Sequence, residues 1–176
     1  MEYRLSAPFN KDDIKTLKAG DKVLLSGTIY TARDAAHKRM ADCLEKKDPL
    51  PFDVKGNVIY YLGPSPARPG QVIGSAGPTT AGRMDKYTPD LIRLGLLGMI
   101  GKGRRTKEVI DSIREFGAVY FAATGGAGAL LSKCIKSSEV LAYEDLGTEA
   151  IRKLYVEDLP LIVAVDPEGT DIYDRG

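Results

Sequence analysis

The spacing of apolar residues along the chain predicts strands and helices joined by turns rich in glycine and proline. Apolar, β-branched runs bounded by turn residues predict strands at 22–32, 58–62, 71–75, 118–123, 140–143 and 159–165. Apolar residues spaced three or four apart predict helices at 11–18, 33–47, from 88 to about 98, at 106–117 and in a run ending at 134. Because strands and helices alternate only in the second half, we expect an α/β fold with a mixed sheet.

Capping residues mark the expected ends of three of these helices. Asn10 stands where its side chain can cap the first helix. Thr88 is expected to cap another helix, with Pro89 at its first position. Thr106 is expected to begin the next helix and Gly117 to end it.

Composition indicates one ordinary globular domain covering residues 1–176. The hydrophobic fraction is 43% and the charged fraction 28%, which suits a single well-packed core. With 25 basic and 24 acidic residues, the chain has no overall field for nucleic acid, so we expect no nucleic-acid partner. No apolar run approaches the ~18 residues of a membrane span and the N-terminus has no signal pattern, so we expect a cytoplasmic protein with no membrane partner.

Two cysteines, Cys43 and Cys134, lie far apart and lack any C-x-x-C spacing. A structural zinc site or an iron–sulfur cluster needs three or four ligands of this kind. We therefore expect no metal ligands in this chain, and two buried thiols instead.

Three glycine-rich turns follow predicted strands, at 74–82, 101–103 and 125–128. Each alone is typical of a tight turn, and none has the spacing of a P-loop or of a dinucleotide-binding loop. The first combines three glycines, a proline, two threonines and an arginine within ten residues. Such bare backbone, next to hydroxyls and a guanidinium, suits the close approach of a small anion.

Basic residues beside these turns are candidates for binding that anion. Arg33 stands at a strand-to-helix boundary with His37 one helical turn later, Arg83 follows Thr79 by four residues, and Lys102 lies between two glycines. Alone, each cation is typical of a solvated surface group, and a lone histidine is typical of a structural hydrogen bond. Together the cations could bind two carboxylates. Because the chain has one histidine, Ser-His-Asp or Cys-His chemistry is not expected, and a non-catalytic module for small anions stays an alternative.

Four segments carry a resemblance to a known family: GTIYTARDAAHKRM, GSAGPTTAGRMDKYTPDLI, GMIGKG and FGAVYFAATGGAGALLSKCI. They resemble the β subunit of class I, iron–sulfur-dependent fumarate hydratases and tartrate dehydratases, from about Leu5 to Tyr173. The resemblance implies a three-layer, swivelling β/β/α domain that closes over a partner α subunit in a hetero-oligomer. It also implies that the α subunit, not this chain, holds a [4Fe-4S] cluster through three cysteines, with one iron open to substrate.

The resemblance assigns roles to residues by motif position. Arg33, Arg83 and Lys102 are expected to bind the substrate carboxylates. Thr79 matches the residue proposed as the catalytic base, and His37 is expected only to support the site. Asp85 is expected to orient Arg83 or to cap the local turn.

The implied reaction is the reversible hydration of a carbon–carbon double bond, which interconverts fumarate and malate. In that reaction the open iron acts as a Lewis acid on the substrate hydroxyl, while a base takes the proton from the neighbouring carbon. L(+)-tartrate or another 2-hydroxy dicarboxylate stays an alternative substrate, because a single pocket side chain can decide between them.

Overall fold

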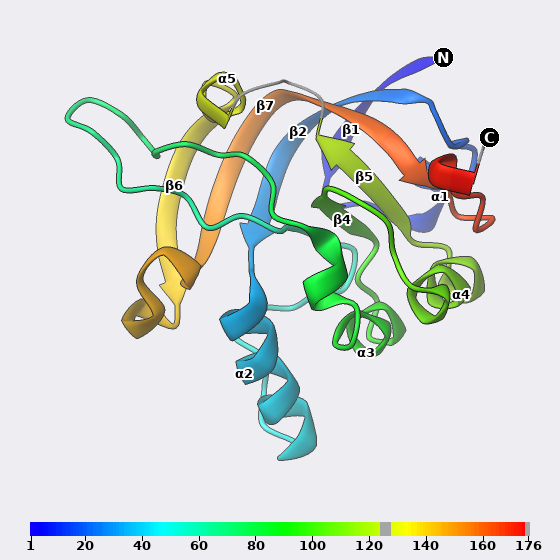
Figure 1. The fold of residues 1–176 in the computed structure, drawn as a ribbon, viewed down its shortest axis with the longest axis horizontal. Helices are drawn as coiled ribbons and strands as arrows, with labels where there is room; N and C mark the ends of the chain where they lie inside the picture. Colours follow the sequence, from blue (N-terminus) through cyan, green and yellow to red (C-terminus); the bar gives the residue numbers. More distant parts are fainter. Residues whose placement is uncertain (124–127, 175–176) are drawn as a thin grey trace.

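The structure, a computed structural model, describes residues 1–123 and 128–174, and their strands form one mixed sheet (Figure 1). The strands are β1 (Glu2–Ala7), β2 (Lys22–Thr31), β3 (Val58–Tyr60), β4 (Gly98–Gly101), β5 (Val119–Ala123), β6 (Ile135–Ala142) and β7 (Ile151–Val165). The α-helices are α1 (Lys11–Ile14), α2 (Asp34–Glu45), α3 (Thr88–Arg93), α4 (Lys107–Phe116) and α5 (Gly128–Ser132). Three short 3₁₀ helices complete the elements: η1 (Ala81–Met84), η2 (Glu144–Glu149) and η3 (Ile172–Asp174).

The sheet folds back on itself through β7. Strands β1 to β5 pair in parallel, in chain order. The long strand β7 then pairs antiparallel with β5, with β6 and with β2, which closes a ring through β2, β3, β4, β5 and β7. The expected mixed sheet is therefore confirmed, and its two β layers together with the helices give the expected three layers.

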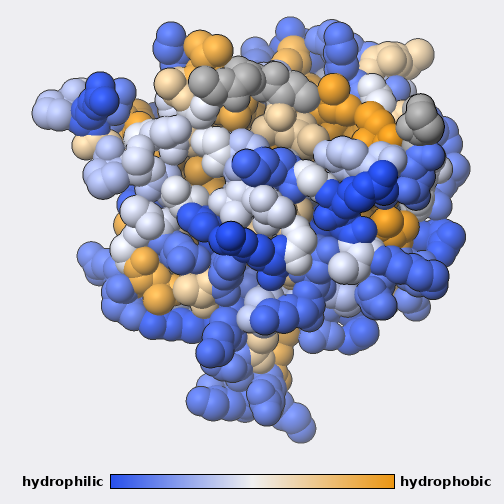
Figure 2. All heavy atoms as spheres, in the orientation of Figure 1, coloured by the Kyte–Doolittle hydropathy of each residue, from blue (hydrophilic) through white to orange (hydrophobic). Residues whose placement is uncertain are grey.

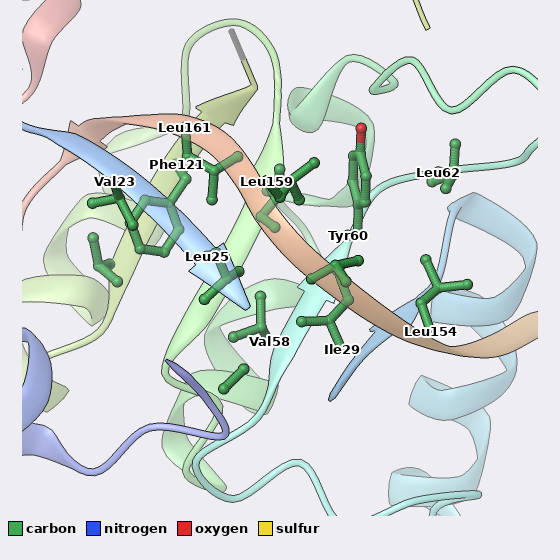
Figure 3. Packing of buried hydrophobic residues seen from close by; sticks show 14 of the residues in the cluster. Val23, Leu25, Ile29, Val58, Tyr60, Leu62, Phe121, Leu154, Leu159 and Leu161 are labelled. Atoms are coloured by element: carbon green, nitrogen blue, oxygen red, sulfur yellow. The ribbon is translucent and has the colours of Figure 1, made fainter. Parts of the chain in front are cut away.

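Alternate residues of β3 and the segment after it face two different cores. Val58, Tyr60 and Leu62 belong to the core enclosed by the folded sheet. Ile59 and Tyr61 belong to a second core on the outer face of the same strand. Figure 3 shows side chains of the enclosed core, contributed by β2, β3, β5 and β7, pointing toward one another.

Three helices cover the second core on one side of the sheet (Figure 1). Their buried residues include Met40 of α2, Leu91 of α3, and Val109 and Ile113 of α4. Figure 2 shows that the solvent-facing surface around α2 is largely hydrophilic. No helix in residues 1–123 or 128–174 combines the length and apolar character needed to cross a membrane.

Two of the expected helix caps are confirmed, and one is wrong. Asn10 accepts from the Asp13 amide in a reciprocal capping box, and Thr106 accepts from the Val109 amide. Thr88, by contrast, donates its hydroxyl to the Met84 carbonyl at 2.8 Å instead of capping α3. The hydroxyl is diverted because Thr88 is buried within a polar cluster described below.

Several predicted boundaries also differ from the structure. The chain at 71–75 forms no strand, because it pairs with no neighbouring strand. The predicted strands at 140–143 and 159–165 are the ends of the longer β6 and β7, and β1 was not predicted at all. The helix predicted at 11–18 closes after Ile14, whose side chain enters the enclosed core.

The close contact between β1 and β2 gives the first testable prediction. Gly27 has a φ of +111°, and a Cβ there would lie 2.3 Å from the Ala7 carbonyl oxygen. We expect Gly27→Ala to lower the free energy of unfolding by about 2 kcal/mol or more, measured by urea denaturation. Gly70→Ala is the matched control, because Gly70 also has a positive φ, of +83°, but open space around it. Equal losses in the two variants would show that the contact with β1 contributes nothing.

Candidate functional site

The candidate site lies at the edge of the sheet where the parallel strands β2, β3 and β4 end. Parallel strands place their carboxyl ends together, and the segments that follow them meet at that edge. Arg33 follows β2, Gly63 follows β3 and Lys102 follows β4. Backbone hydrogen bonds join these ends, from the Ala32 amide to Tyr60 at 3.1 Å and from the Tyr61 amide to Ile100 at 2.8 Å.

Thr79 enters this edge between the ends of β3 and β4. Its amide donates to the Tyr61 carbonyl at 2.8 Å, and its carbonyl accepts from the Lys102 amide at 3.3 Å. The Ala81 amide then donates to the Lys102 carbonyl at 2.9 Å. The backbone therefore holds Thr79 beside Lys102, so these two expected site residues lie next to each other.

Arg83 reaches the same edge from η1. Its guanidinium is 61% exposed, and its Nη1 lies 3.9 Å from Asp34 Oδ2 at the start of α2. Asp34 directly follows Arg33, so this contact places the Arg83 side chain next to the segment that carries Arg33. One oxygen of Asp34 is buried and has no hydrogen-bond partner among the described residues.

Gly63 leaves room for the side chain of Arg33. A Cβ on Gly63 would lie 2.7 Å from Arg33 Nη1, so the guanidinium passes directly over this glycine. The Nε of Arg33 is buried without a hydrogen-bond partner in the part of the chain that the structure describes. Gly63 therefore serves the site by allowing this close approach, a contribution that the sequence analysis missed.

His37 supports the start of α2 from within the protein. Its side chain is only 1% exposed, and its Nδ1 lies 2.8 Å from the Arg33 carbonyl, to which a proton on that nitrogen would be donated. Burial lowers the pKa of His37 to about 4, although the hydrogen bond with Arg33 acts in the opposite direction. The imidazole is therefore neutral at pH 7, and it contacts the backbone of Arg33 rather than adding a charge.

Of the two roles expected for Asp85, the orientation of Arg83 is wrong, because its carboxylate contacts other residues. Its Oδ1 accepts from Arg105 Nε at 2.7 Å, and its Oδ2 accepts from the Thr106 amide at 2.7 Å. The carboxylate instead closes the turn that leads into α4. Arg83, as described above, lies nearest to Asp34.

Arg105 is the buried counterpart of Asp85, and the sequence analysis missed it. Its side chain is 0% exposed. Its Nη2 donates to the Tyr61 hydroxyl at 3.0 Å and to Thr88 Oγ1 at 3.1 Å. The guanidinium also lies over the rings of Tyr61 and Tyr120, at 5.1 and 4.7 Å from their centroids. We call Asp85, Arg105, Tyr61, Thr88 and Tyr120 the Arg105 cluster.

The Arg105 cluster anchors the segment that carries Arg83. Asp85 is the C-cap of η1 and Thr88 begins α3, whereas Tyr61 and Tyr120 project from the sheet. The buried contacts therefore hold both ends of the segment that follows η1 against the outer face of the sheet. No local signal identifies Arg105, because the neighbouring Arg104 is exposed and pairs with Asp174 instead.

The third glycine-rich turn and the cysteines add little to this edge. Residues 125–127 of the expected turn lie outside the described residues. Gly128 accepts a hydrogen bond from the Ala76 amide at 3.0 Å, so the loop before Thr79 packs against the start of α5. Cys43 and Cys134 have separate neighbours, the Tyr143 hydroxyl and the Asp158 carbonyl. Within residues 1–123 and 128–174, no three His, Cys, Asp or Glu side chains gather in a way that could hold a metal ion.

Known proteins are similar to this chain over nearly its whole length. The family model described as "Fumarase C-terminus" matches residues 2–176. A putative L(+)-tartrate dehydratase subunit beta from Methanocaldococcus jannaschii is 40% identical over 99% of this chain and 92% of that relative. Fumarate hydratase 2 from Leishmania major is 39% identical over 97% of this chain, and the aerobic class I fumarate hydratase from Escherichia coli K12 is 40% identical over 88%. This chain spans only 31% and 28% of those two longer relatives.

The Arg105 cluster can be tested by removing its carboxylate. We expect Asp85→Ala to lower the free energy of unfolding by about 3–5 kcal/mol, because it leaves a buried guanidinium without its partner. Asp90→Ala is the control, since it removes the carboxylate of the exposed pair Arg93–Asp90, and we expect a far smaller loss. Similar urea midpoints for both variants would contradict the importance of the buried pair.

The burial of His37 predicts a specific dependence on pH. The folded pKa of about 4 lies below the ordinary value of 6.5, so the unfolded chain binds a proton first as the pH falls. The stability contributed by neutral His37 is complete above pH 6.5 and is lost between pH 6.5 and 4. Because the chain has one histidine, its ring resonance can be followed by NMR without ambiguity. A folded-state pKa near 6.5 would contradict the burial described here.

Proposed function

Because the chain belongs to the Fumarase C-terminus family, we propose that it is the β subunit of an iron–sulfur hydro-lyase that interconverts malate with fumarate and water. One observation carries this proposal. Three separate segments bring Arg33, Thr79 with Arg83, and Lys102 to one edge of the sheet. That arrangement supplies cations for a dicarboxylate and a hydroxyl beside them.

The cations of this edge would bind the two carboxylates of the substrate. Arginine suits a carboxylate because its planar guanidinium can donate two parallel hydrogen bonds. Each charge-assisted hydrogen bond contributes about 1.5–3 kcal/mol. Arg33 is oriented by Gly63 and by the start of α2, whereas Arg83 and Lys102 reach the edge from η1 and from the end of β4. Because these cations lie on different elements, they would bind a dicarboxylate at both ends and so determine which carbon faces Thr79.

Thr79 would accept the proton from the carbon next to the one that carries the hydroxyl. A threonine hydroxyl is a weak base, but neighbouring positive charges favour its ionised form. Lys102 is adjacent in the backbone pairing, and Arg83 lies four residues further along the chain. The same cations would stabilise the negative charge that develops on the substrate carboxylate as this proton leaves.

The [4Fe-4S] cluster of this proposal belongs to a partner α subunit within a hetero-oligomer. The described residues do not suit such a group, because Cys43 and Cys134 lie in separate surroundings and no set of three ligands gathers near them. The similarity to a protein named as a subunit beta supports the existence of a partner. A cytoplasmic location stays part of this proposal.

L(+)-tartrate is the second candidate substrate. The relative named for tartrate dehydratase is the one that this chain covers almost completely, at 92% of its length. Fumarate and malate remain our first choice, because two relatives named as fumarate hydratases are 39% and 40% identical over 97% and 88% of this chain. Comparing kcat/KM for malate and L-tartrate, on the complex with the co-purifying α subunit, separates the two.

The catalytic role of Thr79 can be tested against its neighbour Thr80. We expect this chain to have no activity alone and to dehydrate malate once combined anaerobically with its α partner. In that complex, Thr79→Ala should lower kcat at least ~10²-fold while the iron content stays normal. Thr80→Ala is the matched control, because it removes the same hydroxyl one residue further along, and we expect little change.

Two outcomes would overturn the proposal. Robust hydro-lyase activity from this chain alone would remove the need for a partner. Equal activity of the Thr79→Ala and wild-type complexes would remove Thr79 from proton transfer.

A further inference from the structure

A second, separate hollow lies between a projecting loop and the region of α5 and β6. The loop comprises residues 63–74, which we call the arm, and Figure 1 shows it projecting from the body past β6. The hollow has a volume of about 570 Å³, which is within the usual range for small-molecule sites. None of Arg33, Thr79, Arg83 and Lys102 is among the residues that line it.

The charged residues that line this hollow are all positive. Arg68 lines it from the arm, and Lys133 and Lys136 line it from the other side, whereas no aspartate or glutamate is among its lining residues. Lys136 donates to the Lys133 carbonyl at 3.0 Å, which draws its ammonium group back toward the end of α5. Within residues 1–123 and 128–174, none of these three cations forms an ion pair.

Some exposed arginines of the same protein, unlike Arg68, have a carboxylate partner among the described residues. Arg39 forms an ion pair with Asp145, and Arg104 forms one with Asp174. Like charges gathered without a counter-charge destabilise a fold unless something else neutralises them. Because no aspartate or glutamate lines the hollow, its three cations are open to a negative group from outside the chain.

Polar groups and a tight backbone contact shape the wall of the hollow. Ser65, Ser75 and Ser132 are among the residues that line it, and the Ser132 hydroxyl donates to the Ala129 carbonyl at 2.7 Å. The Ser75 amide donates to Ser65 Oγ at 2.9 Å, and a Cβ on Gly74 would lie 2.0 Å from the Ser65 carbonyl oxygen. The start of the arm at Ser65 therefore packs closely against its end at Gly74 and Ser75. Hydroxyls and cations on a wall of this kind are the groups that bind phosphate or carboxylate oxygens.

We propose that this hollow is a second anion-binding site, which takes a small polyanion bearing phosphate or carboxylate groups. The ligand would be bound by Arg68 from the arm and by Lys133 and Lys136 from the opposite wall. Because Gly74 and Ser75 line the hollow and Thr79 follows closely in the chain, the bound anion would also order the segment that leads to Thr79. The site does not depend on the hydro-lyase activity proposed above.

The test measures binding of two probes, pyrophosphate and citrate, to the full chain. Calorimetry at about 0.15 M salt limits non-specific attraction to the surface. We expect at least one probe to bind, and the double variant Lys133→Gln/Lys136→Gln to weaken that binding at least about tenfold. In two-dimensional NMR, the same probe should shift the amide resonances of Gly74, Ser75 and Ser132.

Two further variants separate this site from the edge that carries Arg33 and Arg83. Lys22→Gln/Lys46→Gln removes the same charge from exposed positions elsewhere on the surface, and we expect it to leave binding unchanged. Arg83→Ala should leave the probe-induced shifts of the Gly74, Ser75 and Ser132 amides unchanged, because Arg83 does not line the hollow.

The proposal is overturned if neither probe binds. It is also overturned if Arg83→Ala abolishes binding while Lys133→Gln/Lys136→Gln retains it, since both probes would then occupy the other edge. Neither result depends on catalytic activity, so failure here is distinguishable from failure of the proposed hydro-lyase function.

Discussion

A guanidinium buried away from water is stable only when an opposite charge and hydrogen-bond acceptors surround it. Arg105 meets this requirement through Asp85, Thr88 and the hydroxyl of Tyr61, and its guanidinium lies over the rings of Tyr61 and Tyr120. Satisfying that one charge brings the end of η1 and the start of α3 onto the sheet. The position of the segment between Thr79 and α3 therefore depends on this buried cluster.

The candidate site follows from that constraint combined with the topology. Parallel pairing places the ends of β2, β3 and β4 at one edge, where Arg33 and Lys102 lie. The segment that carries Thr79 and Arg83 fills the same edge because its backbone pairs with Tyr61 and Lys102. Buried groups thus do the positioning, and exposed groups such as the Arg83 guanidinium remain available for a ligand and a partner.

The sequence predicts what depends on near neighbours in the chain. Three local patterns illustrate this. The structure contains the cap at Thr106 and a strand within 118–123. It also brings together the cations that stand beside glycine-rich turns. The first half of β7 was not predicted, because its pairing with β2 and β6 joins segments far apart in sequence. Adjacent arginines differ only through tertiary contacts, since Arg104 is exposed and Arg105 is buried. Sequence alone does not distinguish them.

The most direct test of the account is a crystal structure of this chain in complex with the proposed α subunit and a bound dicarboxylate. We expect carboxylate oxygens of the ligand within hydrogen-bonding distance of Arg33, Arg83 and Lys102, with the Thr79 hydroxyl facing the carbon that loses its proton. We also expect every cysteine ligand of the cluster to come from the partner. A dicarboxylate bound away from this edge, or a cluster ligated by Cys43 or Cys134, would contradict the account.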